Sequence, residues 1–176
     1  MTDIPAHPEP KHSALERLVA VINARGDGDA IRGVLSEFSD GSEHYPDEAV
    51  DAVRTGSASM EALFDIDDLD SAALRINEIL SATSSRPRLS NHNGARWHLH
   101  VDREPLDWES WFLSASALAM AVCISDQGEI PWGRCARAEC GRVFSGLGGG
   151  TAQTYCSNRC GSRERMAKRR ASARSD

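Results

Sequence analysis

The chain has 176 residues, of which 40% are hydrophobic and 26% are charged, with a formal net charge of −6 at pH 7. This apolar fraction excludes a fully disordered chain, because disordered chains lack the apolar surface that offsets chain entropy. Residues 1–11 lack the basic start and apolar run of a secretory signal. The longest uncharged apolar run, residues 111–124, is too short to span a membrane. We therefore expect a soluble cytoplasmic protein.

The charges and the cysteines divide the chain at the same place. Residues 1–130 hold 10 basic and 23 acidic residues, whereas residues 131–176 hold 10 basic and 3 acidic residues. Four of the five cysteines also lie in the second part. Such an asymmetry indicates a module that meets an anion. We expect two domains, a helical domain over residues 1–130 and a small basic domain over residues 131–176.

The first two predicted helices are marked by apolar stripes. Ser13 would cap the first helix, and Gly26 would end it. The second helix follows residues 27–29. Each helix has four apolar residues at the spacing that forms one apolar face. These are Leu15, Leu18, Val19 and Ile22 in the first helix and Ile31, Val34, Leu35 and Phe38 in the second.

Three further helices are predicted before the first strand. Pro46 suits the first position of a helix, and Gly56 would end that helix. Residues 57–64 would then form one short helix. Residues 67–82 predict a longer amphipathic helix with acidic residues in its first turn. The apolar positions of this helix are Leu69, Ala73, Ile76 and Leu80.

The next segment changes to the period of a β-strand. Residues 88–90 and 96–102 alternate polar and apolar side chains, and Asn93-Gly94 between them is typical of a hairpin turn. One face of the hairpin would pack on the protein and the other would face solvent. The packed face would hold Trp97, Leu99 and Val101, and the solvent face His98, His100 and Asp102.

From Asp107 to about Ile124, the chain predicts one helix that is apolar on most sides. A helix that is apolar nearly all round is a buried one, so we expect this helix at the centre of the core. Residues 1–130 show no catalytic constellation, and we therefore expect no enzymatic activity.

Four cysteines carry the chemistry of the second part. Their spacing is Cys135-x4-Cys140-x15-Cys156-x3-Cys160, which is two close pairs separated by a loop. This spacing suits a tetrahedral zinc site that takes two thiolates from each pair. Four thiolates leave no open position on the metal, so the zinc would be structural. The alternatives are two disulfides, a redox-active dithiol, four incidental thiols and an iron–sulfur cluster.

The residues around these cysteines predict a small finger similar to a treble clef. Residues 142–144 would form a short strand, with Phe144 packed under the metal site. A helix would run from residues 155–160 to about residue 171, with Ala167 and Ala171 packed on the finger. The expected fold class is a mainly α domain with one β-hairpin, followed by a small treble-clef-like zinc finger.

The predicted C-terminal helix is basic around most of its surface. This pattern suits contact with several phosphates, and arginine binds phosphate through two hydrogen bonds at once. We expect a nucleic acid as the partner, either DNA or RNA, and the alternative is a module that docks an acidic protein. The expected nucleic-acid contacts are Arg159, Arg163, Lys168, Arg169, Arg170 and Arg174.

Residues 134–171 resemble the CGNR zinc finger, a family named for a Cys-Gly-Asn-Arg run. In this chain the run begins at Cys160 and has Ser162 in place of asparagine. In that family the finger follows a helical domain called ABATE, in bacterial proteins regarded as stress-induced transcription regulators. The resemblance implies DNA binding and transcription regulation.

The N-terminal part is similar to the ABATE domain in the order and length of its segments. The similarity rests on residues 21–23, the hairpin with Trp97 and the helix over residues 111–122. We expect this acidic domain to form a homodimer or to sense a small-molecule effector. Its negative charge discourages it from lying on nucleic acid itself.

Overall fold

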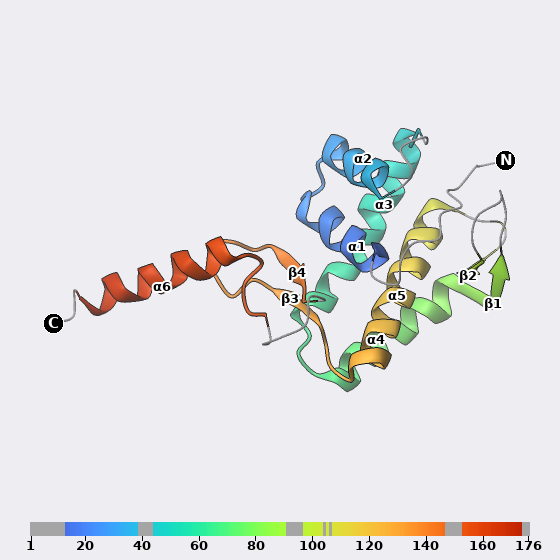
Figure 1. The fold of residues 1–176 in the computed structure, drawn as a ribbon. Helices are drawn as coiled ribbons and strands as arrows, with labels where there is room; N and C mark the ends of the chain where they lie inside the picture. The colour runs from blue at the N-terminus through green and yellow to red at the C-terminus, as the bar shows by residue number, and fades with distance from the viewer. Residues whose placement is uncertain are drawn as a thin grey trace.

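The structure is a computed structural model of the chain and describes residues 13–38, 44–90, 97–103, 105, 107–146 and 153–173. These residues form a helical body from which one helix projects (Figure 1). They contain six α-helices, one short 3-10 helix and two two-stranded antiparallel sheets. The predicted fold class, mainly α with a β-hairpin and a small C-terminal finger, is confirmed.

The helices and strands follow the predicted order. The first part contains α1 (Ser13–Asn23), α2 (Gly28–Glu37), α3 (Asp47–Met60), the 3-10 helix η1 (Glu61–Asp65) and α4 (Leu69–Thr83). The hairpin and the long helix follow as β1 (Ser84–Ser90), β2 (His98–Asp102) and α5 (Trp108–Gln127). The finger contains β3 (Trp132–Arg134), β4 (Val143–Ser145) and α6 (Asn158–Ser172). The boundary expected at residue 130 falls between α5 and β3.

Aspartates cap three of the helices. The carboxylates of Asp27, Asp68 and Asp107 accept hydrogen bonds from backbone N–H groups in the first turns of α2, α4 and α5. These N–H groups have no partner within their own helix, so the caps stabilise the helix starts. At the other end of α5, Gly128 has a φ of 70°, in the left-handed region that favours glycine. The helix therefore ends three residues beyond the predicted end.

Gly56 does not end α3, contrary to the prediction, but lies inside it. A Cβ at Gly56 would lie 3.3 Å from the Phe112 ring and 3.5 Å from Leu113. The glycine thus allows α3 and α5 to approach closely, and α3 continues to Met60. The prediction of one short helix over residues 57–64 is also wrong, because these residues end α3 and continue into η1.

The buried face of α4 differs from the predicted one. Ile76 is buried as expected, but Leu69 is exposed, and the other buried positions are Ala72, Ile79 and Thr83. The helix also begins two residues later than predicted, after its cap at Asp68. The apolar residues of α4 extend beyond the face that the core covers, so a count of apolar positions alone places the face wrongly.

The hairpin of β1 and β2 is antiparallel, with Leu89 opposite Leu99. Its predicted packed face is only partly buried, because exposure rises toward the tip from 8% at Val101 to 49% at Leu99 and 67% at Trp97. The strand β2 packs on α5, and the exposure of Leu99 and Trp97 corrects the prediction that both lie on a packed face. The Asn93-Gly94 turn and the side chains of His98 and Asp102 lie outside the described residues.

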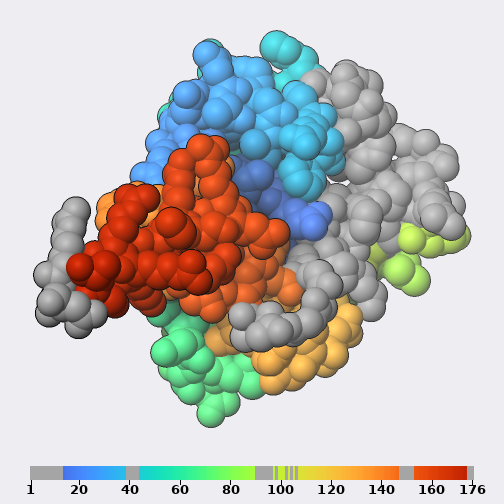
Figure 2. All heavy atoms as spheres, turned by 60° about the vertical axis from the view of Figure 1, so that its left-hand side comes forward, coloured from blue at the N-terminus to red at the C-terminus, as the bar shows by residue number. Residues whose placement is uncertain are grey.

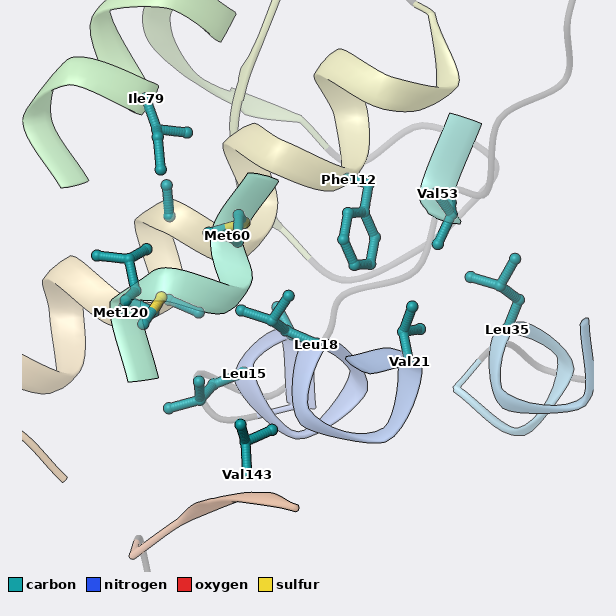
Figure 3. Close-up of a cluster of buried hydrophobic side chains, with 14 of the residues drawn as sticks. Leu15, Leu18, Val21, Leu35, Val53, Met60, Ile79, Phe112, Met120 and Val143 are labelled. Carbon is teal, nitrogen blue, oxygen red and sulfur yellow. The ribbon is translucent and has the colours of Figure 1, made fainter. Parts of the chain in front are cut away.

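The core surrounds α5, which packs against α1, α3 and α4. Figure 3 shows side chains from these helices and from β4 converging on one cluster, with Leu18, Met60, Phe112 and Met120 among them. The apolar run of residues 111–124 is predicted to be too short to span a membrane. The helix α5 that contains it is longer, and by length and composition it could cross one. Its buried side chains nevertheless pack against other helices, as in the core helix of a globular fold.

The strands of the finger share this core. Trp132 and Val143 are buried in the same cluster as the helices, and the Trp132 indole N–H donates to the Leu63 carbonyl at 3.1 Å. The Phe144 ring lies across Gly133 on the neighbouring strand, 3.3 Å from where a Cβ would be. The helical part and the base of the finger are therefore packed together.

Candidate metal centre and basic helix

The four predicted ligands converge on one point. The Sγ atoms of Cys135, Cys140, Cys156 and Cys160 all lie within 4.8 Å of one another. The Sγ–Sγ distances are 3.6 Å for Cys140 and Cys156 and 3.7 Å for each of these with Cys160. A disulfide needs about 2.05 Å, and all four cysteines are free. Sulfurs around a tetrahedral zinc, at about 2.3 Å from the metal, lie about 3.8 Å apart, so this geometry fits a metal ion.

The first pair lies on the turn between β3 and β4. Cys135 directly follows β3, and its N–H donates to the Arg142 carbonyl at 2.8 Å. Cys140 precedes Gly141, whose φ of 63° is one that residues with a side chain rarely adopt. This turn reverses the chain, so that both cysteines lie at the same end of the small sheet.

The second pair lies at the start of α6. The prediction placed both cysteines in the helix, but Cys156 precedes it and only Cys160 is helical. The helix begins after Ser157, whose Oγ accepts the N–H of Cys160 at 3.2 Å. This cap fixes the first turn of α6. The four-residue spacing still brings the two sulfurs together.

The thiols of the second pair differ in acidity when no metal is bound. Burial, with the neighbouring thiols, raises the pKa of Cys156 to about 12. Hydrogen bonding by Ser157, followed by that of the neighbouring thiols, lowers the pKa of Cys160 to about 7. A metal ion binds thiolates, so these protons must leave when it binds.

Arginine side chains connect the first cysteine pair to the helical part. A guanidinium nitrogen of Arg25 donates to the Cys140 carbonyl at 2.7 Å. Arg134 donates from Nε and Nη2 to the two carboxylate oxygens of Asp65, at 2.6 and 2.9 Å, and from Nη1 to the Gly141 carbonyl at 3.0 Å. The hydrogen bond with Arg134 lowers the pKa of Asp65 below its ordinary value.

Asn23 makes a second connection, at the end of α1. Its Nδ2 donates to the Val143 carbonyl at 2.9 Å, and its Oδ1 accepts the Val143 N–H at 3.0 Å. The backbone N–H and C=O of Val143, the first residue of β4, are thereby both satisfied by one side chain from the helical part. The sequence does not predict these contacts of Asn23, Arg25 and Arg134 between the two parts, because the partner residues lie 69 to 120 positions away along the chain.

The basic helix α6 projects from the finger (Figure 1, Figure 2). Cys160 and Gly161 are its buried residues, and a Cβ at Gly161 would lie 3.3 Å from the Tyr155 ring. The predicted packing of Ala167 and Ala171 on the finger is wrong, because both are exposed. Among the described residues, the buried positions of the helix lie in its first turn, so the helix leaves the finger after that turn.

The structure brings five of the six predicted nucleic-acid contacts onto this one exposed helix. Arg174 lies outside the described residues. Arg165, which the prediction did not include, donates to the Ser162 hydroxyl at 2.9 Å. Glu164 is the acidic residue of the helix. The exposed contacts are Arg159, Arg163, Lys168, Arg169 and Arg170.

Residues 132–173 match the family model of the CGNR zinc finger. The matched segment begins at β3, ends just after α6 and contains the four clustered cysteines. No curated protein matches the chain. The match covers the finger, and the ABATE resemblance of the helical part stays a prediction.

Proposed function

We propose that the protein is a DNA-binding transcription regulator whose helix α6 contacts DNA phosphates. The observation that carries this proposal is a helix with six basic residues and one acidic residue, exposed along its length and anchored at one end. Sequence-independent affinity for DNA comes mainly from basic side chains that displace counterions from phosphates. The match to a zinc finger supports the same interpretation.

Zinc is the metal that we propose for the four cysteines. The sulfur distances suit a tetrahedral ion, and four thiolates are typical of structural zinc. The zinc would hold the start of α6 against the turn after β3 and would take no part in a reaction, which favours a role other than catalysis. Metal analysis of the purified protein tests this, because zinc would give one equivalent and an iron–sulfur cluster would give a coloured protein.

The helical part would then be the regulatory domain of a bacterial cytoplasmic protein. Residues 1–130 carry the excess of acidic residues, which disfavours contact of this part with DNA. In this proposal α6 is the DNA-binding element, and the ABATE-like part forms a dimer or binds a small-molecule effector.

DNA binding by matched charge variants tests the proposal. The double substitution Arg169→Gln with Arg170→Gln removes two charges from α6, and Arg75→Gln with Arg86→Gln removes two exposed charges from the helical part. Binding of each zinc-loaded protein to one mixed-sequence duplex is measured by fluorescence anisotropy across a salt series. Each lost phosphate contact flattens the log–log salt dependence by about 0.9.

For the α6 variant we expect the log–log salt slope to be shallower by roughly 1.8 and the affinity for DNA to be roughly tenfold lower. The control variant should bind like the wild type. Equal losses in both variants would show that binding follows net charge and not α6. Absence of binding at low salt would favour a module that docks an acidic protein. Stronger binding to single-stranded RNA than to duplex DNA would favour an RNA-binding protein.

A further inference from the structure

We infer that α6 binds in the major groove of B-form DNA, through the face that lies opposite its anchored side. The inference rests on the proposed function and adds the groove, the face of the helix and discrimination against duplex RNA. It follows from the positions of the buried and the basic residues around the helix axis.

The anchored side of α6 is defined by its two buried residues, Cys160 and Gly161. Cys160 belongs to the metal centre, and Gly161 lies against the Tyr155 ring. At about 100° per residue, the direction opposite the midpoint of these two residues passes between Ser162 and Met166. This direction is the centre of the face that is free to meet a partner.

Four of the five arginines of α6 lie around this centre, Arg165 lies about 90° from it, and the other two charged residues lie behind it. Glu164 and Lys168 lie about 150° or more from the centre, on the anchored side. Ala167 and Ala171 lie on that side as well, although they are exposed. The arginines within about 70° of the centre are Arg159, Arg163, Arg169 and Arg170.

The middle of this face is only partly charged, because Arg159 lies about 30° from the centre on one side and Ser162 about 30° from it on the other. Met166 is 48% exposed at its centre, although methionine is a large apolar residue, and Ser162 is exposed beside it. Arg163 and Arg169 lie on opposite sides of this centre line. The face therefore has Met166 at its centre and guanidinium groups on both sides, with Arg159, Arg163 and Arg170 on one side and Arg169 on the other.

The major groove of DNA presents the complementary arrangement. A helix about 10–12 Å across fits a groove about 12 Å wide, with a phosphate backbone along each wall and base edges at the floor. Flanking arginines would contact phosphates on both walls, whereas Met166 would reach thymine methyl groups and Ser162 base-edge polar atoms. A helix that only lay along one backbone would need no basic residue on the second side of the face, where Arg169 lies.

This geometry also separates DNA from RNA. The major groove of A-form RNA is deep and narrow, and side chains on a helix cannot reach its floor. A duplex RNA of the same sequence offers as many phosphates but no major groove that admits α6. The inferred partner is therefore duplex DNA.

Binding of the zinc-loaded full chain to three duplexes of one sequence tests the inference. One duplex is unmodified DNA, one is DNA with each cytosine replaced by glucosylated 5-hydroxymethylcytosine, and one is RNA. The glucose groups fill the major groove and leave the number of phosphates unchanged. We expect roughly tenfold or greater loss of affinity for the glucosylated DNA and for the RNA, relative to unmodified DNA.

Equal affinity for unmodified and glucosylated DNA would overturn the major-groove inference while leaving the proposed DNA binding intact. Failure to bind unmodified DNA at low salt would instead overturn the proposed function, and the inference with it. The two failures are thus distinguished in one experiment.

Two neighbouring substitutions test the face. Lys168→Gln and Arg169→Gln remove the same charge from adjacent positions of the same exposed helix. We expect Arg169→Gln to reduce the salt slope by about 0.9 and Lys168→Gln to reduce it by less than half as much. Equal reductions would overturn the assignment of the face. Met166→Ala should weaken binding to unmodified DNA and leave binding to glucosylated DNA unchanged.

Discussion

Asn23 and Arg134 each join the finger to the helical part through more than one hydrogen bond. Asn23 satisfies both backbone groups of Val143, and Arg134 joins the carboxylate of Asp65 to the carbonyl of Gly141. Gly141 immediately follows a metal ligand. The position of the metal centre therefore depends on residues that bind no metal.

Removal of the Asn23 amide should destabilise the fold. Asn23→Ala would leave the part-buried N–H and C=O of Val143 without this partner, at an expected cost of about 1–3 kcal/mol in the free energy of unfolding. Urea denaturation of the zinc-loaded protein measures it. The control is Asn77→Ala, at an exposed position of α4, which should change stability by less than about 0.5 kcal/mol. Indistinguishable midpoints for the two variants would contradict the role of Asn23.

Arg134 should act as a positioning residue for the metal. Arg134→Gln loses the hydrogen bonds to Asp65 and disturbs the one to Gly141, so we expect zinc affinity to fall by about tenfold or more in competition with a chelator. The matched control is Arg137→Gln, since Arg137 pairs with Glu139 at 2.9 Å within the turn between the first two ligands. Equal effects of both substitutions would show that local charge, and not the link to the helical part, governs zinc affinity.

At the scale of the elements, the close contact between α3 and α5 depends on Gly56. Gly56→Val would place extra atoms against the Phe112 ring, and we expect a loss of about 1–3 kcal/mol in the free energy of unfolding. Gly33→Val is the control, because a Cβ at Gly33 in α2 meets nothing within 4 Å. This control should change stability by less than about 0.5 kcal/mol. A neutral Gly56→Val would mean that the two helices do not need to approach so closely.

The sequence predicts an element well where its signals are local. The stripes of α1 and α2, the start of α5 and the cysteine spacing lie within a few residues of the features they determine, and the structure agrees with each of them. The alternation of polar and apolar residues predicts the hairpin equally clearly, but it does not show how far along the two strands the core reaches. Exposure of Trp97 and Leu99 depends on that reach.

Other features could not be predicted because they depend on contacts between distant segments. Gly56 looks like a helix end until Phe112 is known to lie against it. The roles of Asn23 and Arg134 likewise require partners that are 120 and 69 positions away. The packing predicted for Ala167 and Ala171 assumed that α6 stays on the finger, and helical periodicity carries no information on where a helix leaves its neighbours.

At the scale of the whole molecule, the metal centre and the helical core are packed into one body. Trp132 and Val143 lie in the core cluster, within a few residues of the metal ligands Cys135 and Cys140. A structural metal contributes its binding energy to folding. Loss of the metal should therefore weaken the helices as well as the finger.

Metal removal tests this coupling. We expect Cys160→Ala to abolish stoichiometric zinc binding and to lower the melting temperature of the whole chain in a single calorimetric transition. Cys123→Ala serves as the control, because Cys123 is buried in α5 and should leave one zinc bound. If Cys160→Ala leaves the helical part melting at its original temperature, with only a small separate transition lost, the finger and the helices are energetically independent.

The salt dependence of DNA binding tests the central claim most directly, namely that the metal-held basic helix is a DNA-binding element. The account predicts that the zinc-loaded protein binds a mixed-sequence duplex with a log–log slope between about −3 and −5, as expected for four or five phosphate contacts. It also predicts that a chelator abolishes this binding, because α6 then loses its anchor at Cys160. No binding at low salt, or binding that survives complete removal of the metal, would contradict it.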